Sequence, residues 1–287
     1  MPATAAVAVI GGSGLYSLFD PTESKARRIR TPYGPADVTI GQLGGRTVAF
    51  LTRHGADHSV APHLIDYRAN IWALASLGVQ AIVSSAAVGG VSPDYPPGSL
   101  VLTDQFIDRT HGRADTFFDR GSVQHLAAAD PFCPELHELA ADALAEFDDV
   151  IPTGTVVVIQ GPRFSTRAES LWFRAAGAHT VNMTLYPEVP LAAELNIGTV
   201  NLSFVTDSDA GLAPAAKPAD AATPDTTTAI ASDDVSAELV FARLAAAQPV
   251  IVAAIGAIIR SIPEQYTARE LIAPDAVAEV LARQVQR

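Results

Sequence analysis

The sequence has little cysteine and little positive charge. A single cysteine, Cys133, stands among 287 residues. It excludes an intrachain disulfide framework and a thiolate metal cluster and indicates a reducing compartment, so we expect a cytoplasmic protein. Lysine and arginine together number 19 against 31 aspartates and glutamates, a formal net charge of −12. This excess of negative charge disfavours nucleic acid and anionic membranes as partners, although a small anion can bind at one local cationic pocket.

Long hydrophobic runs are also scarce. The apolar run at 5–10 has no positively charged region before it, and the run at 249–259 is too short to span a bilayer. With 48% hydrophobic and 17% charged residues, the chain has enough apolar material for a large core. No internal repeat is visible. We therefore expect one soluble α/β domain over residues 1–287.

Two short apolar runs end in small residues. The run at 5–10 leads into Gly11-Gly12-Ser13-Gly14, and the run at 81–83 leads into SSAAVGG at 84–90, so each predicts a buried strand followed by a loop. Glycines permit positive φ and close backbone approach, and a serine hydroxyl adds a donor. The first loop therefore forms either a nest for a phosphate-like anion or an ordinary turn. The dinucleotide fingerprint fits badly, because Ser17 stands where its last glycine belongs.

A cation and several histidines follow a predicted hairpin. Residues 38–40 and 46–51 alternate in polarity around 41–45, which places Arg53 and His54 just past the second strand. Such a guanidinium either holds a phosphate through two parallel hydrogen bonds or is a surface arginine paired with a carboxylate. A metal site at His54, His58 and His63 is disfavoured, because no cysteine helps, Pro62 interrupts the pattern and no fourth ligand is evident.

The stretch 180–209 carries the strongest functional signal. Two apolar runs stop at Asn182-Met183-Thr184 and at Thr206-Asp207-Ser208-Asp209, and the segment between them, PEVPLAAELN, has helical spacing. We expect strand, helix and strand, with the two strands parallel and close together and their polar ends in one crevice. That crevice would hold a hydroxyl, an amide and two carboxylates. The alternative for the carboxylates is a turn with solvated side chains.

Four further expectations concern the rest of the chain. Residues 210–234, rich in Ala, Pro, Asp and Thr, predict a mobile loop that covers the crevice as a flap. Helical runs follow at 235–247 and 249–262, and apolar spacing predicts a C-terminal helical extension at 267–287. Phe164 is either an aromatic that stacks on a ligand or part of the core.

Several motifs distributed along the chain resemble one family. They are VIGGSGL, TPYG, LTRHG, YRANIWAL, DQFIDRT, DPFCP, QGPRFSTRAE, NMTLYPEV and TDSD. From about residue 7 to residue 209 the chain is similar to the methylthioadenosine phosphorylase branch of the trimeric purine nucleoside phosphorylases. The resemblance implies a single domain with a mixed central β-sheet flanked by helices. It also implies a homotrimer or homohexamer.

The resemblance implies roles for individual residues. The positions that hold phosphate in the family are matched by Ser13, Arg53, His54, Thr184 and the backbone amide of Ala87. Met183 and Phe164 match positions at the ribose and base, and Asp207 and Asp209 match the pair that recognises adenine. His125 matches a histidine that reaches the adjacent subunit's site near the 5′ substituent.

The chain departs from the family in two places. Ala86 stands where relatives often carry Thr or Asn, so one side-chain contact to phosphate is absent. The segment 210–234 is longer and richer in Pro and Ala than the family leads us to expect, and 267–287 extends past the usual end. These departures affect the loop that we expect to cover the crevice and the pocket for the 5′ substituent.

The implied chemistry is cleavage of a purine N-glycosidic bond by phosphate. Such a reaction passes through an oxocarbenium-like state and needs a nucleophile at the anomeric carbon and an acid for the departing base. Phosphate is the nucleophile and co-substrate, Asp207 is the acid, and no cofactor or metal is required. Burial beside Asp209 is expected to raise the pKa of the pair. Three other functions stay open: a 6-oxopurine phosphorylase, a hydrolytic nucleosidase, and a nucleotide-binding sensor without turnover.

Overall fold

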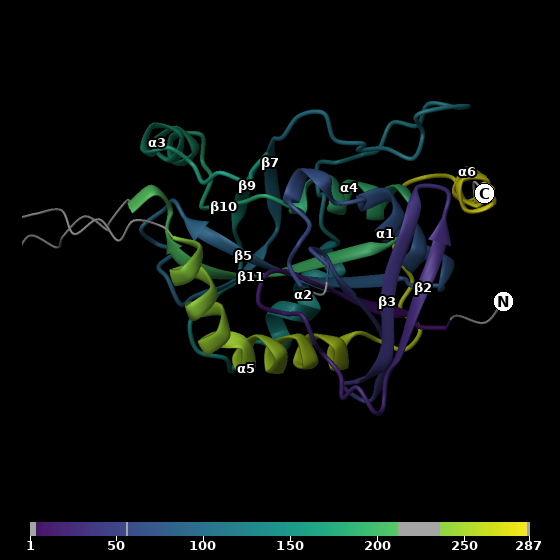
Figure 1. Cartoon of the computed structure of the whole chain (residues 1–287), viewed down its shortest axis with the longest axis horizontal. Helices are drawn as coiled ribbons and strands as arrows, with labels where there is room; N and C mark the ends of the chain where they lie inside the picture. The colour runs from purple at the N-terminus through teal and green to yellow at the C-terminus, as the bar shows by residue number, and fades with distance from the viewer. Residues whose placement is uncertain (1–3, 56, 212–235, 286–287) are drawn as a thin grey trace, which may run out of the picture.

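The computed structural model of the chain describes residues 4–55, 57–211 and 236–285. A mixed β-sheet with helices on both faces forms its body, as predicted (Figure 1). The strands are β1 Val7–Gly11, β2 Lys25–Thr31, β3 Gly34–Leu43, β4 Arg46–Thr52, β5 Ala81–Gly90, β6 Leu100–Thr103, β7 Gln105–Arg109, β8 Val150–Ile151, β9 Thr155–Ile159, β10 Thr180–Asn182 and β11 Gly198–Ser208. The helices are α1 Tyr67–Ser76, α2 Pro134–Ala143, α3 Arg167–Ala175, α4 Leu185–Glu194, α5 Ala237–Ser261 and α6 Pro274–Leu281, with 3-10 turns at Pro62–Leu64 and Asp209–Gly211.

Strand β5 is the centre of the sheet because it pairs with three other strands. Its first residues, Ala81–Ser84, run parallel to β1, and its whole length runs parallel to β11. Its last two residues pair antiparallel with β10. The predicted loop at 84–90 is therefore wrong. These small residues continue the strand, because the ladder with β11 provides partners for their backbone groups as far as Gly90.

The order strand, helix, strand predicted for 180–209 is confirmed as β10, α4 and β11. Tyr186 and Pro187 have non-helical dihedrals, so the regular part of α4 begins at Glu188. The predicted pairing, however, is wrong. β10 pairs with β9 and with the end of β5, whereas β11 pairs with β5 and β6, so β10 and β11 are not parallel neighbours. The end of β5 lies between them, and both strands still deliver their polar ends to one region.

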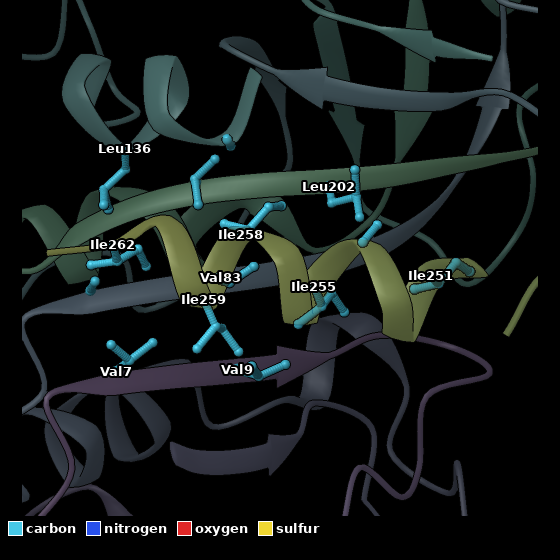
Figure 2. Packing of buried hydrophobic residues seen from close by; sticks show 14 of the residues in the cluster. Val7, Val9, Val83, Leu136, Leu202, Ile251, Ile255, Ile258, Ile259 and Ile262 are labelled. Atoms are coloured by element: carbon cyan, nitrogen blue, oxygen red, sulfur yellow. The ribbon is translucent and has the colours of Figure 1, made fainter. Parts of the chain in front are cut away.

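Helices cover both faces of the sheet, so its central strands are buried on both sides. Along β1, Val7 and Val9 belong to one core cluster, and Ala8 and Ile10 belong to another. The first cluster lies under α5 and α2, and the second lies under α1, α4 and α6. Figure 2 shows α5 lying across β1, β5 and β11, with Ile255 and Ile259 directed toward these strands.

Helix α5 is one helix of 25 residues, not the two that the sequence predicts. Pro249 lies inside it and removes one backbone donor, but the apolar face continues across the proline from Leu244 to Ile259. By length and composition alone α5 is long and apolar enough to cross a membrane, as the core helix of a soluble protein can also be. Its buried face packs in the core of this fold.

The predictions for the segments 210–234 and 267–287 have different outcomes. In the described part of the C-terminal segment, 267–285, the helix is Pro274–Leu281, which is shorter than predicted. It begins at Pro274 because a proline can begin a helix but not continue one. The predicted mobile loop at 210–234 lies outside the described residues, apart from 210–211.

The packing of α5 generates a test of its role as a core helix. Ile255 is fully buried, whereas Val250 on the same helix is 50% exposed. Ile255→Ala should lower the free energy of unfolding by about 2–5 kcal/mol, because it leaves a cavity in the core. Val250→Ala should change that free energy by less than about 0.5 kcal/mol. Urea denaturation followed by circular dichroism measures both, and equal effects would contradict the assignment of the buried face.

Candidate active site

A cavity of about 450 Å³ lies where the ends of β1, β4, β5, β10 and β11 converge. Nine of the ten residues predicted from the sequence line it: Ser13, Arg53, His54, Ala87, Phe164, Met183, Thr184, Asp207 and Asp209. His125 does not line the cavity of its own chain. It lies in the long segment between β7 and α2. The structure thus brings together residues that are as far apart in the sequence as Ser13 and Asp209.

The glycine-rich loop after β1 packs directly on Arg53. A Cβ atom at Gly12 would lie 2.9 Å from Arg53 Nη1 and 2.5 Å from the carbonyl oxygen of Ser85. The Arg53 backbone N–H donates to Gly11 O at 3.0 Å, which fixes the loop to the end of β4. Only glycine fits at position 12, and the close approach brings Ser13 to the cavity beside the guanidinium.

Arg53 is buried and already paired. Its Nε donates to Glu188 Oε2 at 2.6 Å, its Nη2 donates to Glu188 Oε1 at 2.7 Å, and its Nη1 donates to Ser85 O at 2.9 Å. Burial alone would lower the pKa of Arg53, but Glu188 more than offsets it, so the pKa is raised and the group stays charged. The sequence analysis missed Glu188, although a carboxylate inside an otherwise apolar segment was the available signal.

His54 is neutral at physiological pH. Burial lowers its pKa to about 4, and the nearby Arg53 and His58 act in the same direction. Its Nδ1 lies 2.9 Å from Val60 O. Because a carbonyl only accepts, Nδ1 carries the ring proton and Nε2 keeps a lone pair. His54 therefore offers an acceptor, which suits a hydroxyl or a protonated oxygen of a ligand.

Asp207 and Asp209 are buried carboxyl groups at the end of β11. Burial raises the pKa of Asp207 to about 6, and Asp209 adds to the rise, while the Thr206 hydroxyl opposes it. The pKa of Asp209 is raised by burial as well, with the hydroxyls of Ser170 and Ser165 opposing. The expected rise in pKa is thus confirmed, and the alternative of a solvated turn is wrong, because Asp207 is 5% and Asp209 2% exposed.

The Thr206 hydroxyl holds one oxygen of Asp207 in place. Thr206 Oγ1 donates to Asp207 Oδ2 at 2.7 Å and also lies 3.2 Å from Val88 O. A hydrogen bond donated to a carboxylate stabilises its ionised form, which is why Thr206 opposes the rise in pKa. Burial outweighs this contact, so the pKa of Asp207 remains raised.

Small residues of β5 leave room beside these carboxyl groups. A Cβ atom at Gly89 would lie 3.1 Å from Asp207 Oδ1 and 3.1 Å from Asp209 Cβ. Ala86 and Ala87 line the same cavity and contribute only methyl groups. Since Ala86 has no polar side-chain atom, β5 offers an anion its backbone and not a hydroxyl at that position.

The rest of the lining is mostly apolar and aromatic. Met183 and Phe164 contribute to it, and Phe164 is 39% exposed, so it lies at the rim and not in the core. The start of α5 adds Val240 and Phe241, and Phe241 meets the ring of His58 edge-on at 5.2 Å. The sequence analysis missed the contribution of α5, since no local signal connects this helix to strand ends far away in the chain.

The described residues show no metal centre. Within 4–55, 57–211 and 236–285, no group of three or more His, Cys, Asp or Glu side chains could hold a metal ion. The arrangement instead provides a charged arginine, neutral hydroxyl and amide donors, and a carboxyl group that exchanges its proton near neutral pH. These are the groups that bind an anion and protonate a leaving group.

Comparison with known proteins places the chain among enzymes. The model of the Phosphorylase superfamily matches residues 6–246. S-methyl-5′-thioadenosine phosphorylase of Mycolicibacterium smegmatis is 52% identical over 206 residues, which are 71% of this chain and 77% of that protein. Purine nucleoside phosphorylase of Streptomyces coelicolor is 46% identical over 218 residues, which are 72% of this chain and 77% of that protein.

Solved structures agree with these relatives. A methylthioadenosine phosphorylase from an antarctic soil metagenomic library has a TM-score of 0.72 and 39% identity, covering 90% of this chain and 85% of that one. A mutant of adenosine/methylthioadenosine phosphorylase from Schistosoma mansoni, in complex with methylthioadenosine, has a TM-score of 0.78 and 28% identity, covering 96% of this chain and 97% of that one. By its sequence and its fold, the chain belongs to the Phosphorylase superfamily.

Proposed function

We propose that this chain cleaves S-methyl-5′-thioadenosine with inorganic phosphate and releases adenine and 5-methylthioribose 1-phosphate. One observation carries the proposal: a single cavity holds the buried cation Arg53 and the buried carboxyl pair Asp207 and Asp209. The cation can bind an anion, and the carboxyl pair can bind a purine. The names of the relatives and the methylthioadenosine bound in the structure from Schistosoma mansoni support the same substrate.

In the proposed reaction, a phosphate oxygen forms a bond to the anomeric carbon of the ribose while the bond from that carbon to the purine nitrogen breaks. The bonding electrons move to the purine, and Asp207 donates its proton to the base nitrogen N7. Arg53, Ser13, Thr184 and the amide of Ala87 hold the phosphate. Because the pKa of Asp207 is raised to about 6, the group can give up and recover a proton near neutral pH.

The carboxyl pair supports selectivity for adenine. Adenine presents an acceptor at N7 and a donor amino group at position 6, which a protonated Asp207 and an acceptor oxygen of Asp209 satisfy together. The oxygen of a 6-oxo group only accepts hydrogen bonds, as the carboxylate of Asp209 does, so the two cannot form a hydrogen bond. The apolar side chains of Met183, Val240 and Phe241 suit a methylthio group at the 5′ position.

The assembly and the cellular setting belong to the same proposal. We propose a homotrimer or homohexamer in the cytoplasm, with purine nucleoside and phosphate as its only small partners and no cofactor, nucleic acid or membrane. His125 supports an oligomer, because it is outside the cavity of its own chain. In an oligomer, the segment between β7 and α2 would carry it to a neighbour's site.

A substrate panel separates this function from its alternatives. Methylthioadenosine, adenosine and inosine are incubated with the protein, with and without phosphate, and free base is measured. Base release should require phosphate, and inosine should have a kcat/KM at least about tenfold lower than methylthioadenosine, because an unpaired buried polar group costs about 1–3 kcal/mol. Equal release without phosphate would indicate a nucleosidase, preference for inosine a 6-oxopurine phosphorylase, and no release a binding module.

Asp207→Asn should slow the reaction and stabilise the fold. The loss of the proton donor should lower kcat by about 10²–10⁴-fold. The folded protein raises the pKa of Asp207 from 3.8 to about 6, so it binds more protons than the unfolded chain between these values and loses stability as pH rises through them. At pH 7 the variant should therefore be about 1–3 kcal/mol more stable than the wild type.

Denaturation at pH 7 and at about pH 3 measures the change in stability caused by Asp207→Asn. The stability difference between Asp207→Asn and the wild type should vanish near about pH 3, below both pKa values. A kcat within a few fold of wild type would remove Asp207 from the chemistry, while a difference in stability that is independent of pH would contradict its raised pKa.

The oligomer is tested through His125. Light scattering should give the mass of a trimer or hexamer at working concentration. His125→Ala should raise the KM for methylthioadenosine by about tenfold, the typical value of one lost hydrogen bond, and leave the KM for phosphate unchanged. A monomer with full activity would contradict both the assembly and the role of His125.

A further inference from the structure

The guanidinium of Arg53 has a carboxylate partner before any ligand arrives. Arg53 and Glu188 form two hydrogen bonds of 2.6 and 2.7 Å, and their side chains are 1% and 5% exposed. The two residues are 135 positions apart in the sequence, one at the end of β4 and one in the first regular turn of α4. Both side chains are therefore almost fully shielded from solvent.

The pair determines which part of Arg53 an anion can reach. A guanidinium has five N–H groups. Glu188 takes those of Nε and one of Nη2, and Ser85 O takes one of Nη1, which leaves one N–H on Nη1 and one on Nη2. Gly12 also packs close to Nη1. A phosphate therefore cannot use the side edge of the guanidinium, which Glu188 occupies, and is left with the remaining N–H groups of Nη1 and Nη2.

The pair also sets the charge at the end of the cavity where Arg53 lies. The charges of Arg53 and Glu188 cancel, and His54 is neutral because burial lowers its pKa to about 4. Removing one partner of a buried ion pair leaves an uncompensated charge, which is strongly unfavourable. Without Glu188, each release of the anionic product would leave Arg53 as a buried charge with no partner.

We propose that Glu188 is a positioning residue of the phosphate site, which orients Arg53 and serves as its counter-ion whenever the site holds no anion. This inference rests on the proposed function, since it assumes that Arg53 receives phosphate. Glu188 limits the affinity for phosphate, because the anion binds to a pair that is already neutral. It also directs the phosphate to the end of the guanidinium, beside Ser13 and Ala87.

Glu188→Gln tests the inference because it removes the charge and keeps the shape. Without the negative charge, Arg53 attracts phosphate more strongly, and the amide of Gln can accept from only one of the two N–H groups that the carboxylate held, so the guanidinium is less firmly oriented. Isothermal titration with inorganic phosphate should give a Kd at least about tenfold lower than wild type. The kcat should fall at least about tenfold, because tighter binding in a displaced position does not stabilise the transition state.

Glu194→Gln is the matched control. Glu194 is a second buried carboxylate of α4, and it accepts hydrogen bonds from Thr116 Oγ1 and Phe117 N, both at 2.6 Å, away from the cavity. Its variant should keep the Kd for phosphate and the kcat close to wild type, even if the fold is less stable. A loss of stability alone therefore cannot produce the combination of lower Kd and lower kcat.

Glu188→Asp keeps the charge and loses reach. Its Kd for phosphate should stay within about threefold of wild type while kcat falls, since the charge remains but the orientation of Arg53 is impaired. If Glu188→Gln does not fold, Glu188→Asp provides the test. A tenfold change in the Kd of Glu188→Asp for phosphate, in either direction, would overturn the inference.

The outcomes separate this inference from the proposed function. Unchanged or weaker phosphate binding by folded Glu188→Gln would overturn the role of Glu188 while the wild type still requires phosphate. Wild-type protein that neither binds phosphate nor requires it would overturn the proposed function itself.

Discussion

The buried pair of Arg53 and Glu188 is the interaction on which the site depends. It joins the end of β4 to the start of α4, and through Ser85 O it also reaches β5. Gly12 packs against the same guanidinium, so the loop after β1 has its position set by it too. Three strands and a helix therefore meet at one planar group, and the donors that surround the cavity take their positions from it.

Around this pair the site keeps its formal charge low by burial. Desolvation lowers the pKa of His54 and raises those of Asp207 and Asp209, so each group moves toward its neutral form. The neutral His54 accepts at Nε2, and a protonated Asp207 donates, which are the reverse of the roles that their charged forms would have. The same burial that stabilises the core thus prepares the site for proton transfer.

Several residues of the cavity could be predicted from the sequence because they lie at or near strand ends. Ser13, Arg53 and Asp207 all come directly after apolar runs, and strand ends converge at one edge of a sheet. Glu188 and Phe241 were missed, since the partners of each lie far away in the sequence. A carboxylate within an apolar segment indicates a buried partner for Glu188, but not which residue that partner is. The extent of β5 was missed for a related reason: its small residues continue as a strand only because β11 pairs with them.

The threefold pairing of β5 makes that strand intolerant of changes in length. Successive side chains of a strand point to opposite faces, so one inserted residue would invert every position after it. In β5 that shift would disturb the ladders with β11 and β10 together and would exchange the face on which Ala87 and Gly89 lie. Homologous chains should therefore vary in length at connections such as 144–149, between α2 and β8, and keep the span 81–90 free of insertions and deletions.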